Sequence, residues 1–260
     1  MNVSSMTNKI LPTLSTLVYI FLWAPAIILV IFSFSNNRFG IKWEGFTLQW
    51  YFDVANTPAV RDALIKSLII ASVTVIVATI AGAVIAYGLY KYRFRGRGLL
   101  RSAILLPMVM PSVVTGGALL IFFTRALHIP LGYLSVIIAH ITFSIPLAMF
   151  VILGRMQRID WSLEEASMDL GADILTTLRK ITVPLLLPAL IASAALIFPW
   201  SFDDFIITYF VAGVGTTTLP IYIFSQLRFG ATPVINTIGT IFIVLPIVGL
   251  LLMHFLQKKK

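Results

Sequence analysis

The sequence predicts an all-α integral membrane protein with six transmembrane helices, and three observations support this fold class. The 260 residues are 59% hydrophobic and only 11% charged, whereas about a quarter of the residues in an average soluble domain are charged. The apolar residues form long uncharged runs, and the basic residues gather between those runs. A soluble fold of this length could not bury so much apolar surface, so we expect one transmembrane domain over residues 1–260.

Six runs are long enough to cross about 30 Å of hydrocarbon, which takes about 20 helical residues. In lipid, a helix pairs every backbone N–H and C=O group within its own segment. The first run is too long for the core of a cleavable signal peptide, so we expect it to be retained. Kinks are expected inside the helices at Pro107, Pro111 and Pro146. The predicted helices span residues 10–35, 66–90, 100–125, 132–154, 184–212 and 236–257.

The placement of the basic residues predicts the orientation. In this six-helix arrangement six of the nineteen Lys and Arg residues fall on one side, namely Arg38, Lys42, Arg61, Lys66, Arg125 and Arg228. The other thirteen fall on the opposite side, with the two termini. Because cytoplasmic loops carry the excess of Lys and Arg, both termini are expected in the cytoplasm. The net charge of +9 is therefore a topology signal, and a nucleic-acid partner is not expected.

The first outer loop, residues 35–61, is rich in aromatic residues. Aromatic side chains of this kind anchor a segment at the membrane interface, and they can also dock an external partner. Both interpretations remain open from the sequence.

The loop over residues 155–183 holds five of the ten acidic residues of the chain. Ser162 and Glu165 have the spacing of a capping box, which predicts a helix starting near Leu163. Gly171 is expected to end that helix with a positive φ angle. A second helical piece is expected over residues 174–181, so the loop reads as a helix–turn–helix.

Leu163, Ala166 and Leu170 form one apolar stripe on the first of these helices. A stripe bordered by charge and not needed by lipid is typical of a docking surface for a cytoplasmic partner. The alternative is a helix that lies on the lipid headgroups. The acidic side chains disfavour this alternative, because anionic lipid attracts basic faces.

This loop resembles the EAA loop of binding-protein-dependent ABC importer permeases. The resemblance rests on Glu165-Ala166-Ser167, Gly171, Ile181 and Val183-Pro184. The chain departs from the family pattern at Ser167, where the family has Ala, and at Val183, where it has Leu. The resemblance implies a coupling helix, seated in a groove of a separate ATPase, to which Glu165, Ala166, Ser167 and Gly171 would belong. Glu165 could cap its own helix or contact the ATPase, and the sequence does not separate these roles.

The resemblance further implies a non-catalytic subunit of the bacterial inner membrane without cofactor or metal. It would pair with a second, related permease chain in a heterodimer. Two copies of a cytoplasmic ATPase and an external substrate-binding protein would complete the transporter. The chain itself lacks the G-x-x-x-x-G-K-[ST] loop, so ATP hydrolysis would belong to the partner.

Other segments look like the spermidine/putrescine permeases of this family. They are Phe39-Gly40 with Trp43, Gly45-Phe46-Thr47, Trp50-Tyr51, Tyr92-Arg93-Phe94-Arg95-Gly96, His140-Ile141-Thr142-Phe143 and Ser201-Phe202-Asp203-Asp204. This likeness implies a polyamine substrate, although neighbouring subfamilies carry other small solutes on the same architecture.

Asp203 and Asp204 are expected to be the only carboxylates at membrane depth, where a charge costs at least about 2.5–3.5 kcal/mol. No Lys or Arg lies deep enough to pair with them, so water, another subunit or a cationic substrate is expected to do so. Aromatic faces that could bind an ammonium group lie beside them, namely Trp200, Phe202, Phe205 and Tyr209. The alternative is a structural pair at a subunit interface. His140 is interpreted as a polar core residue rather than a proton relay.

Two other classes of function fit less well. An intramembrane aspartyl protease needs two carboxylates that face each other over a shared proton, and consecutive residues on one helix cannot provide this. A stand-alone channel or carrier does not require an EAA loop, and carriers commonly show inverted repeats that are not evident here.

Overall fold

The structure is a computed structural model that describes residues 3–37, 42–228, 230 and 232–258. Within these residues the regular elements are helical, apart from one isolated bridge between Ser35 and Phe46. The α-helices are α1 (Val3–Phe32), α2 (Gln49–Asn56), α3 (Pro58–Lys91), α4 (Arg97–Val109), α5 (Ser112–Ile121), α6 (Tyr133–Met156), α7 (Ser162–Asp169), α8 (Ile174–Thr177), α9 (Val183–Phe202), α10 (Ile206–Val211), α11 (Leu219–Leu227) and α12 (Pro233–Gln257). Two π-helical turns complete the set, η1 (Phe122–Ala126) and η2 (Leu178–Thr182).

The all-α prediction is confirmed at the level of helical, apolar architecture. Within the described residues four helical stretches are long and apolar enough to cross a membrane, namely Leu11–Phe32, Pro58–Lys91, Tyr133–Met156 and Ile174–Phe202. A fifth span results if the bent pair Arg97–Val109 and Ser112–Ala126 crosses as one. α12 contains a shorter apolar stretch, Pro233–Gly249.

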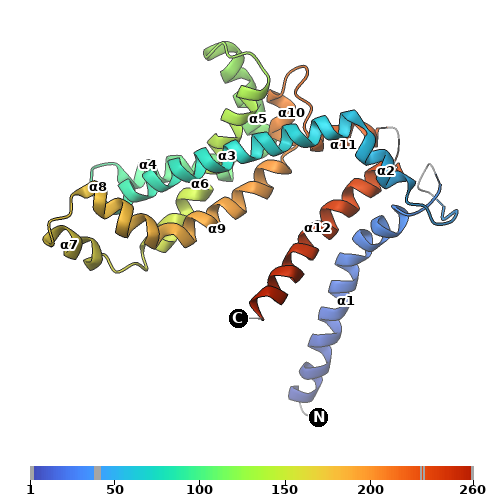
Figure 1. Ribbon diagram of the computed structural model, residues 1–260, viewed down its shortest axis with the longest axis horizontal. Helices are drawn as coiled ribbons and strands as arrows, with labels where there is room; N and C mark the ends of the chain where they lie inside the picture. The colour runs from blue at the N-terminus through green and yellow to red at the C-terminus, as the bar shows by residue number, and fades with distance from the viewer. Residues whose placement is uncertain (1–2, 38–41, 229, 231, 259–260) are drawn as a thin grey trace. The chain divides into compact units, whose positions relative to one another are not determined.

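Contacts divide the chain into two compact units, Asp62–Ile221 and the combination of Met1–Arg61 with Tyr222–Lys260. In the first unit, α6 is the central helix, with twelve buried residues along its length. One half of α6 packs with α3 and α9 in a cluster that includes Ala86, Met149 and Ile197. The other half packs with η1 and α10 around Phe123 and Val136. Figure 1 shows α3, α6 and α9 running together in this unit.

The second unit combines both ends of the chain. α1 contacts α12, and Leu29 approaches Gly239 closely enough to touch a Cβ atom placed there. The segment between α1 and α2 is held to both helices' ends, because the Phe34 ring stacks on the rings of Phe46 and Tyr51 at 5.4 and 5.2 Å. The Trp50 indole donates a hydrogen bond to the Ser35 carbonyl at 2.8 Å. The aromatic loop is therefore a folded element, with Trp43 and Phe52 still exposed.

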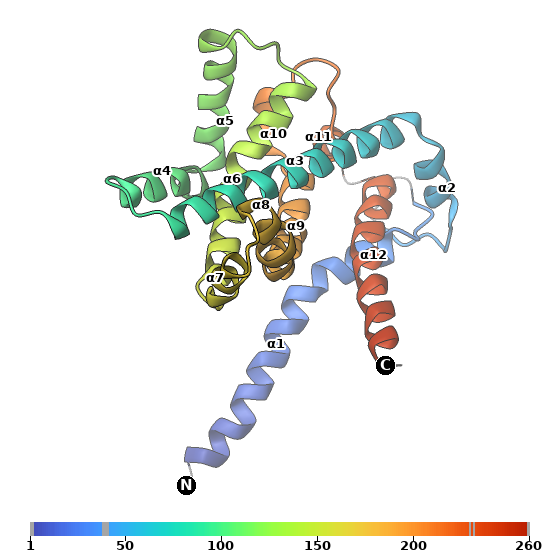
Figure 2. The same ribbon diagram turned by 60° about the vertical axis from the view of Figure 1, so that its left-hand side comes forward.

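Two of the predicted helices are broken in the structure. The third bends by 105° between α4 and α5. The bend is visible in Figure 2. Met110 is extended there, with φ −71° and ψ 141°, because the residue before a proline is disfavoured in the α region. The fifth was expected to be continuous over residues 184–212, which is wrong. α9 ends at Phe202, and α10 starts at Ile206. Pro146, in contrast, lies inside an unbroken α6.

Candidate functional site

The helix in the loop between α6 and α9 forms as predicted, but its start is different. α7 begins at Ser162 without a side-chain cap from the residue before it. The backbone N–H of Ser162 donates to Asp160 Oδ1 at 3.1 Å. The predicted capping box between Ser162 and Glu165 is therefore wrong, because Asp160 takes its place. Glu165 is exposed and free of that local role.

Gly171 ends the first helix of the loop with φ +86°, as predicted. The backbone N–H of Gly171 donates to Met168 O at 2.9 Å, and that of Ala172 donates to Ser167 O at 3.1 Å. This pair of bonds satisfies carbonyls that a helix end leaves unpaired. A residue with a Cβ atom is strained at this φ angle.

Asp173 starts the next helical piece, α8, and accepts a hydrogen bond from Thr176 N at 3.1 Å. Hydrogen bonds from the Thr176 hydroxyl and backbone hold the pKa of the Asp173 carboxyl below its ordinary value. Because the pKa of this carboxyl is lower in the folded than in the unfolded state, the cap stabilises the fold fully at a pH above the unfolded pKa. This stabilisation is lost as the pH falls through the folded-state pKa. Ser167 Oγ lies 3.1 Å from Thr177 Oγ1, so the two helical pieces are also tied to each other.

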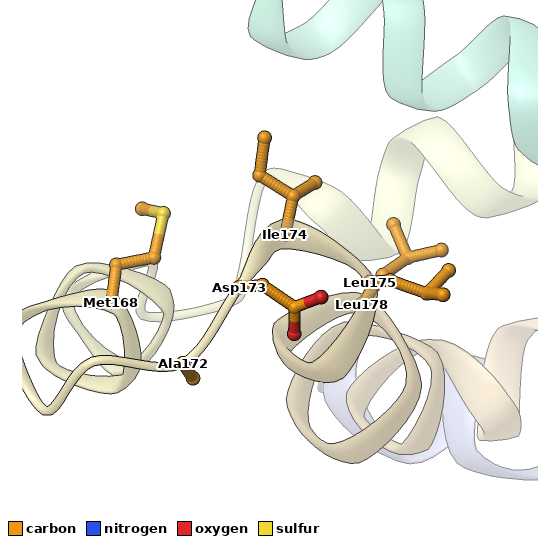
Figure 3. A pocket seen from close by; sticks show the side chains of 6 residues that line it. All are labelled: Met168, Ala172, Asp173, Ile174, Leu175 and Leu178. Carbon is orange, nitrogen blue, oxygen red and sulfur yellow. The ribbon is translucent and has the colours of Figure 1, made fainter.

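One side of this helix–turn–helix is apolar and bare. Leu170, Ile174 and Leu175 are 89, 75 and 71% exposed. Figure 3 shows the open hollow between α7 and α8, where Ile174, Leu175 and Leu178 lie on α8 and η2 opposite Met168. Leu170 lies outside the apolar stretches that could cross a membrane, whereas Ile174, Leu175 and Leu178 lie at the start of the stretch Ile174–Phe202. Exposed apolar side chains gathered in this way are typical of interaction surfaces.

Asp204 is held where the fifth predicted helix breaks. Its Oδ2 atom accepts from Thr208 N at 2.8 Å and from Thr208 Oγ1 at 2.9 Å. It also lies 3.5 Å from His140 Nε2. His140 is buried, with its ring nitrogens 2.7 Å from Ser201 Oγ and 2.9 Å from Thr208 Oγ1. The interpretation of His140 as a polar core residue is confirmed.

This network corrects one expectation about the acidic pair. Asp204 finds its partners in its own chain, whereas the sequence pointed to water, another subunit or substrate. Asp203 differs, because it is exposed and its carboxylate accepts no hydrogen bond from the described residues. The two aspartates are thus not equivalent. The Asp204 carboxylate is hydrogen-bonded within the chain, and the Asp203 side chain is exposed.

The aromatic residues of this region fall into three groups. Trp200 and Asp204 line the same small hollow of about 90 Å³, together with Phe143. The rings of Phe205 and Tyr209 lie 5.5 Å apart, and Tyr209 is 54% exposed. Phe202 stacks on Phe198 at 5.7 Å. The helix break therefore combines carboxylates with partly exposed aromatic faces, which is chemistry that suits a cation.

Comparison with known proteins shows the family. The profile of the family described as "Binding-protein-dependent transport system inner membrane component" matches residues 78–260. The chain belongs to this family. It is a multi-pass membrane transport component, and its sequence resemblance to the permeases is confirmed.

Two curated relatives cover nearly the whole chain. The spermidine/putrescine transport system permease protein PotC of Haemophilus influenzae is 39% identical over 242 residues, which cover 93% of this chain and 94% of the relative. The putrescine transport system permease protein PotI of Escherichia coli is 37% identical and covers 92% and 88%. A subunit of a solved bacterial ABC transporter involved in alginate import has the same fold, with a TM-score of 0.70, 18% identity and coverage of 99% and 98%.

Sequence reasoning missed three residues that shape these sites. Trp161 and Glu164 attach α7 to its neighbours, and Asp173 caps α8. An Asp two residues after a helix-ending glycine is a cap signal that could have been read from the sequence. The partner of Glu164 lies 73 positions earlier in the chain, and no local pattern could have indicated it.

The acidic pair gives a prediction about stability. We expect Asp204→Ala to lower the free energy of unfolding by about 1–3 kcal/mol, because Thr208 N and His140 lose their acceptor. Asp203→Ala, the matched control, should change it by no more than about 0.5 kcal/mol. Thermal unfolding of the two variants in detergent measures the difference. Equal shifts for both variants would contradict the assignment.

Proposed function

We propose that this chain is a permease subunit of an ATP-driven importer of polyamines in a bacterial inner membrane. The observation that carries the proposal is the identity of 37–39% to PotC and PotI permeases, spread over more than nine-tenths of the chain. The acidic, aromatic break between α9 and α10 supports it, because spermidine and putrescine present ammonium groups along a methylene chain.

The proposed arrangement has six membrane crossings. α4 and α5 with η1 form one bent crossing, and α12 forms the last. The other four crossings are formed by Leu11–Phe32, Pro58–Lys91, Tyr133–Met156 and the α9 part of the stretch Ile174–Phe202. Both termini lie in the cytoplasm, as does the loop over residues 155–183. The support is the distribution of basic residues, which follows the positive-inside rule.

The exposed side of the helix–turn–helix is proposed to dock the ATPase. Glu165, Ala166 and Ser167 lie on α7, and Gly171 forms the turn that separates α7 from α8. Two permease chains, related but not identical, enclose the path, and each binds one ATPase subunit. An external binding protein delivers the substrate, and the folded aromatic loop around α2 gives it a surface to meet.

Asp203 is the carboxylate proposed to meet an ammonium group of the cargo. It is exposed, and its neighbour Asp204 is already bonded to Thr208. Trp200, Phe202, Phe205 and Tyr209 are proposed to supply the aromatic faces of the path. α9 has twenty residues and rises about 30 Å, so this site lies a membrane thickness from the start of α9 at the coupling loop.

The orientation can be tested with introduced cysteines, because the chain has none of its own. We expect Arg95→Cys and Ser162→Cys to resist an impermeant thiol reagent added outside intact cells. Asn56→Cys should react, because it lies in the outer loop and is exposed. The reverse labelling pattern would overturn the proposed topology.

The substrate assignment can be tested by uptake of radiolabelled spermidine or putrescine into vesicles that carry the complete transporter. We expect Asp203→Asn to reduce uptake about tenfold, because losing a charge-assisted hydrogen bond to an ammonium group costs about 1–3 kcal/mol. Asp203→Glu, which keeps the charge, should retain more uptake than Asp203→Asn. The affinity of the external binding protein should not change, since that site lies on another chain.

Two outcomes would contradict this proposal in different ways. Undiminished uptake by Asp203→Asn would remove this residue from the substrate path. Absence of ATP-driven polyamine uptake by the wild-type complex would remove polyamines as the cargo and leave a permease for another small solute.

A further inference from the structure

A partly buried ion pair joins two segments that are far apart in the sequence. The ammonium group of Lys91, the last residue of α3, lies 2.5 Å from Glu164 Oε2 on α7. The side chains are 27% and 5% exposed. A buried carboxylate is tolerated when it is paired and hydrogen-bonded, and Glu164 meets both conditions.

The second oxygen of Glu164 reaches a third element. The Thr182 hydroxyl, in the π-helical turn η2 at the start of α9, donates to Glu164 Oε1. One carboxylate thus links α7 to the end of α3 through Oε2 and to the beginning of α9 through Oε1. Thr182 is itself buried, so water does not compete freely for this bond.

Trp161 completes the joint. Its ring lies 4.3 Å from the Lys91 ammonium group and 5.1 Å from the Tyr90 ring. Its indole N–H donates to Met156 O at 3.0 Å, at the end of α6. Glu164 therefore attaches α7 to α3 and to η2, the turn that leads into α9, and Trp161 attaches the start of α7 to α6. Leu163 and Met168 of the same helix remain exposed.

We infer that Glu164 and Lys91 are positioning residues that transmit movement of α7 to α3 and α9. This inference rests on the proposed function, in which an ATPase moves α7. The reason is geometric. α7 is exposed on one side and bonded to its neighbours on the other, so it moves together with the helices to which it is bonded. α9 then carries the displacement toward the break at Asp203. α3 moves with α7 because the ion pair joins Lys91, at the end of α3, to Glu164 of α7.

The test uses the full transporter in vesicles, with uptake and ATP hydrolysis measured on the same sample. We expect Glu164→Gln and Lys91→Met to co-purify with the ATPase and to keep ATP hydrolysis within about twofold of wild type. Polyamine taken up per ATP hydrolysed should fall about tenfold. Lys91→Arg, which keeps the charge, should stay within about threefold of wild type. Arg101→Met, which removes an exposed positive charge from α4, should not change the ratio.

The double variant Lys91→Met/Glu164→Gln adds a second criterion. If both residues act through one bond, the double variant should be no worse than the worse single variant. If these variants do not assemble, Thr182→Val tests the same joint, because it removes one hydroxyl and keeps the volume. It should lower uptake per ATP about threefold.

The outcomes separate a role in coupling from a role in folding alone. Uptake and ATP hydrolysis that fall in parallel, with an unchanged ratio, would overturn the inference and leave a structural ion pair. An unchanged ratio in assembled Thr182→Val, or additive losses in the double variant, would also overturn it. Polyamine uptake by the wild-type complex that does not depend on ATP would instead contradict the proposed function. Failure of the inference and failure of the proposed function are therefore distinguishable.

Discussion

The fold depends first on the need to pair backbone polar groups where water is scarce. Long helices meet this need without outside help, and the chain uses them wherever its sequence is apolar. Where a helix is interrupted, side chains must supply hydrogen-bond partners for its unpaired backbone groups. At the break before α10, Asp204 accepts the backbone N–H of Thr208, and His140 supports the same cluster. The carboxylate of Asp204 is thereby accounted for by the backbone group that it satisfies, and its neighbour Asp203 is left available.

A second feature follows at the other end of α9. α7 has one face bonded to helix ends and one face that is apolar and exposed. The two faces suit the role proposed for α7. The exposed apolar face can bind a partner, and the bonded face keeps α7 fixed to the neighbouring helices. The turn at Gly171 and the cap at Asp173 fix the shape of the exposed side, so the chain's own hydrogen bonds determine the surface proposed to dock a partner.

Much of this architecture could be predicted because membrane helices and the helix–turn–helix are encoded locally. Apolar runs indicated the spans, and Gly171 ended its helix as expected. What failed were features decided by long-range contacts or local competition. Asp160 displaced the predicted cap, and the partner of Glu164 came from α3. The break in the fifth predicted helix was missed because Asp203 and Asp204 were interpreted as residues within one regular helix, and not as residues at a helix end.

The central claim, that the exposed side of residues 162–178 docks an ATPase, is tested most directly by the pair Gly171→Leu and Gly96→Leu. Both glycines have positive φ angles, +86° and +87°, with open space where a Cβ atom would stand. The backbone strain introduced by leucine is therefore similar at the two positions. We predict that Gly171→Leu permease inserts into the membrane but retains at most a tenth of the wild-type amount of ATPase after purification, while Gly96→Leu retains most of it. Equal retention of the ATPase by both variants would contradict the claim.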